Sequence, residues 1–322
     1  MTTSRPVRLA QRVFPRRLHD SVGSRVLFIL TLVPGVLLLA VTAALVVKTI
    51  PLLQEHSLVS LLAGREWKPM KELFGFLPFI TATIWVTILT LLIAVPPSIL
   101  TAIYLAEYAG KALRSIMKPV LDLLAAIPSV IYGVWGMLVI VPWVQNKVLP
   151  FASRLPEGFP LLKTANPTGF GILSGAIVLA VMVVPFIIAV TNEVLVAVPQ
   201  GIRQASLALG ATRLQTIRRV LLPSTLPGIF ASVVLGFSRA MGETMAVLMV
   251  VGNVAQMPKS ILDPAYPLPA LIANNYGEMM SIPMYDSALM GAALILLMMV
   301  LILNVASTLI LRRLMGRVRR AW

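Results

Sequence analysis

The chain has 322 residues, of which 58% are hydrophobic and 12% charged, and its mean hydropathy is +0.91. These values exclude a soluble globular domain and indicate a polytopic membrane protein, which we expect to be all-α. Cysteine is absent and only His19 and His56 supply imidazole, so disulfides and thiolate sites are excluded and no metal site is expected.

Six apolar runs have the length of roughly 20 residues that a transmembrane helix needs. We predict membrane spans at residues 26–47, 77–105, 120–144, 169–190, 226–251 and 287–311. Residues 26–311 then form one transmembrane domain between basic tails at 1–25 and 312–322. The first run exceeds the apolar core of a signal peptide, so we expect a retained helix. Prolines within the runs predict kinks.

The net charge of +15 is compatible with a nucleic-acid partner or with membrane topology. Of the 27 Lys and Arg residues, 18 lie in the two tails and in segments 111–118 and 203–219, all on one side of the predicted membrane. By the positive-inside rule that side is the cytoplasm, so both termini are predicted to be cytoplasmic. Topology and attraction to anionic lipid account for the surplus, and we expect no nucleic-acid partner.

The phosphate-binding motif G-x-x-x-x-G-K-[ST] does not occur, because the Gly110-Lys111 pair is followed by Ala112. We therefore expect no ATPase site, no catalytic residue and no cofactor on this chain. The predicted outer loops are also too short for an independent ligand-binding domain. If the chain transports a solute, other chains must supply the energy and capture the solute.

Ser129 and Tyr132 follow Pro128 in the third predicted span. Backbone groups freed by a proline, together with nearby hydroxyls, can line a polar pathway through a membrane domain. The alternative is that these two side chains make hydrogen bonds between helices. Both interpretations stay open at the level of sequence.

The longest predicted cytoplasmic connection, residues 191–225, has the pattern of a helix, a turn and a second helix. Residues 200–209 suit a short amphipathic helix, and Gly210 is a natural helix stop. Thr212 can cap a second helix, which we expect Pro223 to end. Such a hairpin is either an interfacial amphipathic element or a docking element for a partner chain.

The spacing in this loop resembles the cytoplasmic E-A-A-x-x-x-G-x9-I-x-L-P motif of ABC importer permeases. The glutamate is replaced by Gln204, the second alanine by Ser206 and the isoleucine by Val220, whereas every spacing is kept. In that family the loop forms a coupling helix that sits in a cleft of the ATP-binding subunit. The resemblance implies that ATP and Mg are bound by that partner, and that the coupling residues here are Gln204, Ala205, Ser206, Gly210 and Pro223.

The fifth predicted span contains two charged residues, Arg239 and Glu243. A charge facing lipid costs about 2.5–3.5 kcal/mol on insertion scales, so both side chains must face protein or water. At i, i+4 spacing on one helix they are predicted to pair. The pair is either a neutralised structural device or a substrate site, in which Arg239 binds an oxyanion while Glu243 orients it. Gly236 and Gly242 are expected to allow close approach of a helix or ligand.

The segments REWKP, LLAAIPSVIYGVWG and GFSRAMGETMAV resemble, in this order along the chain, motifs of phosphate-specific (Pst) ABC importer permeases of the C type. The resemblance implies the type I ABC importer permease fold and import of inorganic phosphate by alternating access across a prokaryotic cytoplasmic membrane. It also implies a paralogous A-type permease, a homodimeric ATP-binding subunit and an extracytoplasmic phosphate-binding protein as partners. Arg239 and Glu243 correspond to the residues implicated in translocation.

Two other functions remain as alternatives. The chain could be a permease for another oxyanion, such as molybdate or sulfate. It could also be a secondary transporter, although no inverted repeat or pair of broken half-helices is detected. A membrane scaffold would leave the charges in the fifth span unexplained.

Overall fold

The computed structural model describes residues 16–154, 156, 160–278, 282 and 284–320. Within these residues six helices are long and apolar enough to cross a membrane, which confirms the predicted number. Residues 1–15 and 321–322 of the two predicted tails lie outside the described residues. In chain order the spans are α1 (Arg16–Glu55), α3 (Leu77–Ile103) with the π-helical turn η2 (Tyr104–Tyr108), the stretch Ser129–Ser153, α8 (Ile172–Val196), the stretch Arg213–Gly242 and α14 (Tyr285–Arg320).

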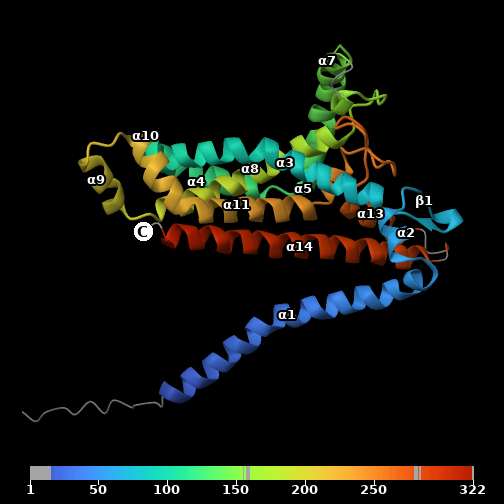
Figure 1. The fold of residues 1–322 in the computed structure, drawn as a ribbon, viewed down its shortest axis with the longest axis horizontal. Coiled ribbons are helices and arrows are strands. Elements are labelled where there is room, and N and C mark those ends of the chain that lie inside the picture. The colour runs from blue at the N-terminus through green and yellow to red at the C-terminus, as the bar shows by residue number, and fades with distance from the viewer. Residues whose placement is uncertain (1–15, 155, 157–159, 279–281, 283, 321–322) are drawn as a thin grey trace, which may run out of the picture.

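The centre of the bundle is α8, which packs against α3 and against α11 (Leu222–Gly242). A helix that is apolar on all sides is stable when other helices surround it, and 67% of the most apolar window of α8 is buried. Leu179, Met182 and Ile187 of this helix are almost fully buried. α14 flanks α11, and α1 contacts α14 but diverges from the bundle toward its own N-terminus (Figure 1).

The third span begins later than predicted. Residues predicted at its start belong to a separate helix, α4 (Lys111–Ala126), and the chain leaves helical geometry at Ile127 and Pro128, with ψ of 128° and 138°. The residue before a proline is disfavoured in the helical region, so Pro128 separates two helices here. The span then runs from Ser129 through α5 (Ser129–Trp135), η3 (Gly136–Ile140), α6 (Val141–Trp143), η4 (Val144–Val148) and α7 (Leu149–Ser153).

The fifth span both starts and ends earlier than predicted. α10 (Arg213–Thr216) continues through the π-helical turn η6 (Ile217–Leu221) into α11, so Pro223 does not end the helix. Pro223 lies just after the π-helical turn η6, and a local π adjustment of this kind accommodates a proline within a membrane helix. The α11 helix stops at Gly242, and α12 (Met245–Leu248) follows after a short break.

One end of the molecule carries irregular structure and a small hairpin. Strands β1 (Trp67–Lys68) and β2 (Leu73–Phe74) pair antiparallel, with Trp67 opposite Phe74. The Trp67 ring contacts Phe79 at a centroid distance of 5.0 Å and Tyr285 at 6.1 Å, which joins this loop to α3 and α14. The remaining short helices of the loops are α2 (Leu58–Ala63), η1 (Pro69–Lys71), η5 (Pro160–Leu162) and α13 (Leu268–Asn275).

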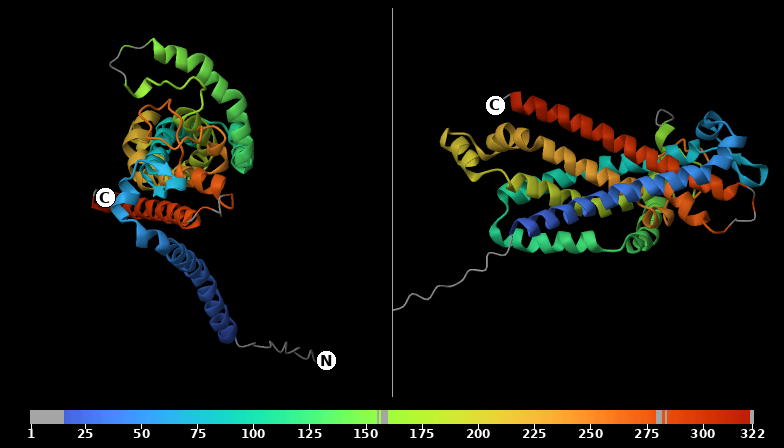
Figure 2. Two further views of the ribbon diagram at one scale, coloured as in Figure 1. Left: turned by 90° about the vertical axis from the view of Figure 1, so that its right-hand side faces the viewer. Right: turned by 90° about the horizontal axis from the view of Figure 1, so that it is seen from below.

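The opposite end of the molecule carries α9 (Gln200–Ala208) and α10. The beginning of α1 and the last turns of α14 lie at this same end, whereas α2, β1 and α13 lie at the other (Figures 1 and 2). An even number of spans therefore returns the chain to the end from which it started, as the sequence predicted.

Candidate functional site

Arg239 lies in the last turn of α11, where it is half-buried among neighbouring helices. One guanidinium nitrogen, Nη2, donates to the carbonyl oxygen of Ala125 at 3.4 Å, and the guanidinium carbon lies 5.5 Å from the centre of the Phe186 ring. Ala125 is at the C-terminal end of α4, where carbonyl groups lack helical partners and a cation is favoured. The guanidinium of Arg239 therefore contacts the backbone at the break between α4 and α5.

Glu243 does not share a helix with Arg239. It is the first residue after α11 and has an extended backbone, with φ of −75° and ψ of 128°. No ion pair joins Arg239 and Glu243 among the residues that the structure describes, so the predicted i, i+4 pairing is wrong. The two half-buried charges are separate groups beside one break in the fifth span.

The break between α4 and α5 and the break between α11 and α12 lie next to each other. α5 packs against α12, and the backbone of Gly133 approaches Ala246 so closely that an added Cβ would lie 3.2 Å from its Cα atom. Tyr132 is buried, and its hydroxyl donates to the carbonyl oxygen of Leu124 at 2.8 Å. Tyr132 therefore makes the inter-helix hydrogen bond that was one of its two predicted roles, while Ser129 is half-buried at the start of α5.

The two glycines near the charges differ in their surroundings. A Cβ on Gly236 would lie 2.8 Å from side-chain atoms of Ile187, so this glycine allows close contact between α11 and α8 as predicted. Gly242 has no neighbouring atom within 4 Å of that position, so no close approach within this chain depends on it.

The coupling loop forms the predicted helical hairpin. Gly210 has φ of +83°, and the amides of Gly210 and Ala211 donate to Leu207 and Ser206, which is a Schellman motif. Thr212 caps α10 in a capping box with Gln215.

The residues of the predicted coupling motif differ in how far they are exposed to solvent. Gln204 and Ala205 are exposed on α9, whereas the Ser206 hydroxyl lies 2.9 Å from that of Thr216 in α10. Gln204 and Ala205 are accessible to a partner, and Ser206 instead holds the two arms of the hairpin together.

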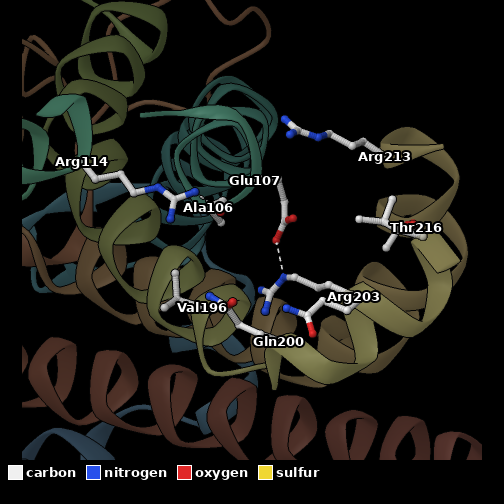
Figure 3. Close-up of a pocket in the computed structure, with 10 residues that line it drawn as sticks. Ala106, Glu107, Arg114, Val196, Gln200, Arg203, Arg213 and Thr216 are labelled. Carbon is white, nitrogen blue, oxygen red and sulfur yellow. Dashed lines mark hydrogen bonds and ion pairs between the residues drawn. The ribbon is translucent and has the colours of Figure 1, made fainter. Parts of the chain in front are cut away.

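A cleft of about 390 Å³ lies between this hairpin, η2, α4 and the end of α8. Figure 3 shows Glu107 near its middle, with Arg203 joined to it by an ion pair of 3.0 Å. Arg114 and Arg213 also line the cleft. The sequence alone does not indicate that Glu107 and Arg203 pair, because residues 96 positions apart give no local signal of contact.

Comparison with solved structures defines the class of fold. Two crystal forms described as inward facing conformations of the MetNI methionine ABC transporter match with TM-scores of 0.56 and 0.52, each at 21% identity. The first match covers 77% of this chain and 99% of the other. The chain has the fold of a type I ABC importer permease, and its six candidate spans make it a multi-pass membrane protein.

Comparison with sequences gives the family. A family model described as binding-protein-dependent transport system inner membrane component matches residues 98–320. The phosphate transport system permease protein PstC of Mesorhizobium japonicum is 38% identical over 257 residues, covering 79% of this chain and 78% of its own. The probable phosphate transport system permease protein PstC of Methanocaldococcus jannaschii is 33% identical over 259 residues, covering 79% and 82%. The chain therefore belongs to the binding-protein-dependent transport system inner membrane components, among the permeases named PstC.

Proposed function

We propose that this chain is one of two permease subunits of an ATP-driven importer of inorganic phosphate. The relatives named for phosphate transport support the substrate, and an arginine held at a double helix break supports the site. The partners are a paralogous A-type permease, a homodimeric ATP-binding subunit that holds ATP and Mg, and an extracytoplasmic phosphate-binding protein. The end that carries α9 faces the cytoplasm, where its cations also meet anionic lipid.

Arg239 is the proposed contact for phosphate. Its guanidinium is permanently charged and planar, so it can donate two parallel hydrogen bonds to an oxyanion. Contact with one carbonyl and one aromatic ring leaves further N–H groups for the substrate. Glu243, beside the same break, adds a negative charge that opposes long retention of the anion, which a transporter must release.

Energy reaches this site through α9. ATP binding closes the partner subunits, α9 moves with them, and the movement passes to the helices that follow and precede the loop, α11 and α8. The pathway then opens outward to accept phosphate from the binding protein, and hydrolysis resets the cycle. The exposed Gln204 and Ala205 are the proposed contacts with the ATP-binding subunit.

The test compares phosphate uptake by Arg239→Ala and Glu243→Ala in the assembled transporter. Each change is expected to abolish uptake while insertion and assembly stay normal, because each removes a charge at the site and leaves the bundle core intact. Arg154→Ala, which removes an exposed arginine at the end of α7, is the matched control and is expected to retain uptake. Normal uptake by both site variants would reduce the two charges to a structural role.

Competition separates phosphate from the other oxyanions. Excess unlabelled phosphate should suppress uptake of labelled phosphate, whereas sulfate and molybdate should not. Uptake that continues without ATP would instead indicate a secondary transporter.

A further inference from the structure

Every nitrogen of the Arg203 guanidinium donates a hydrogen bond. Its Nε donates to Glu107 Oε1 at 3.0 Å, its Nη2 to the carbonyl oxygen of Leu195 at 2.6 Å, and its Nη1 to the carbonyl oxygen of Val198. The side chains of Arg203 and Glu107 are only 17% and 14% exposed. All three guanidinium nitrogens are therefore bound in a partly dehydrated place.

These contacts join three separate elements. Arg203 belongs to α9, Leu195 lies in the last turn of α8 with Val198 just beyond that helix, and Glu107 lies in η2, the end of the second span. Carbonyl groups at a helix C-terminus attract cations, which explains why the guanidinium lies there. The covalent chain connects α9 only to α8 and α10, so the Arg203–Glu107 pair is a direct link from α9 to the second span.

The second span is also fixed from its other side. Arg114 of α4 donates to the carbonyl oxygen of Ala106, the residue beside Glu107. η2 thus receives one arginine from α4 and one from α9, on neighbouring residues (Figure 3). A π-helical turn is a rare element that frequently occurs at functional positions.

We propose that Arg203 is a positioning residue for energy coupling, through which movement of α9 reaches the second span together with the fourth. This inference rests on the proposed function, in which α9 follows the ATP-binding subunit. The pair moves as one unit with η2 because a buried charge that lost its partner would be left uncompensated. A lysine at this position is a single point charge and cannot reproduce the planar fork that reaches η2 and α8 together.

The experiment uses the complete transporter in proteoliposomes with its binding protein, and measures phosphate imported per ATP hydrolysed. Arg203→Lys and Glu107→Gln are each expected to lower that ratio at least about fivefold, the low end of coupling between sites, while complex assembly and ATP hydrolysis persist. The double variant should be no worse than the more severe single variant, because both remove the same link. Arg213→Lys is the matched control, since Arg213 lines the same cleft but is exposed and makes no ion pair among the described residues.

A structural readout accompanies the ratio. Because the chain contains no cysteine, spin labels can be placed at Ala208→Cys in α9 and Tyr108→Cys in η2 without removing others. Arg203→Lys should broaden the distance distribution between these labels, and Arg213→Lys should not.

The outcomes are distinct. An unchanged ratio in both variants overturns the inference, and so does loss of assembly in both, which would make the pair a structural device. Absence of ATP-dependent phosphate import by the unmodified complex would instead contradict the proposed function.

Discussion

Arg239 occupies a position that an apolar helix alone could not stabilise. The insertion cost of a charge, which reaches about 2.5–3.5 kcal/mol at the centre of a membrane helix, has to be offset by polar partners. The carbonyl of Ala125 is accessible only because α4 ends at the next residue, and the Phe186 ring supplies a cation–π contact. The arginine therefore depends on the break between α4 and α5 rather than on a carboxylate in its own helix.

A glycine-to-alanine pair tests how closely α11 and α8 must pack beside this arginine. Gly236→Ala would place a methyl group 2.8 Å from Ile187, and the overpacking is expected to cost about 1–3 kcal/mol of folding free energy. Gly242→Ala meets open space and should change stability by less than about 0.5 kcal/mol. Apparent midpoints of thermal unfolding in detergent, measured at one heating rate, compare the two. Equal midpoints for the two variants would show that α8 and α11 move apart at no cost to make room for the added methyl group.

The residue identities at the candidate site could be predicted from sequence, but their geometry could not. Charges in an apolar run are visible without a structure, which is why Arg239 and Glu243 could be selected. Their pairing required α11 to continue by one more residue, whereas it stops at Gly242. A glycine costs only about 1 kcal/mol in a helix, so its presence does not decide whether a helix ends there. Tertiary packing decides it.

At the scale of elements, the prolines show the same limit. Pro96 and Pro97 lie inside α3 and Pro185 lies inside α8, so those helices continue through them, whereas Pro128 separates α4 from α5. Neighbouring helices can satisfy the backbone groups that a proline frees, and the outcome depends on which neighbours are present. The number and order of the spans follow from hydropathy, and the positions of their breaks do not.

Gly210 sets the angle between α9 and α10 through its left-handed backbone conformation. An added side chain would meet nothing within 4 Å, but φ of +83° is a conformation that costs other residues roughly 1–2 kcal/mol. Gly210→Ala is therefore expected to reduce phosphate import per ATP hydrolysed, and Gly210→Asn should reduce it less because asparagine tolerates this region. Gly201→Ala, inside α9 with open space around it, is the control. Equal coupling in Gly210→Ala and the control would contradict a role for the turn.

At the scale of the whole molecule, α1 stands apart from the other spans. None of the most apolar window of α1 is buried, and the same is true of α14, whereas the corresponding value for α8 is 67%. The exposed residues of α1 include Leu27, Phe28 and Leu39. Sequence hydropathy treats α1 and α8 alike, since it measures the transfer of a segment from water and not what then surrounds it. Which spans form the core of the bundle becomes visible only when the helices are assembled.

The distribution of charge between the two ends of the molecule predicts its orientation. Exposed cations lie on the segments at the α9 end; they are Arg25, Lys111, Arg114, Lys118, Arg213, Arg218, Arg219, Arg312 and Arg313. By the positive-inside rule this end is cytoplasmic.

With no native cysteine, Ala208→Cys in α9 and Met70→Cys in the β1–β2 hairpin each create a single reactive thiol. A membrane-impermeant maleimide added to intact spheroplasts should label Met70→Cys and leave Ala208→Cys unlabelled, and permeabilisation should expose both. Labelling of Ala208→Cys from outside would reverse the orientation and would exclude α9 as the element that meets a cytoplasmic ATP-binding subunit.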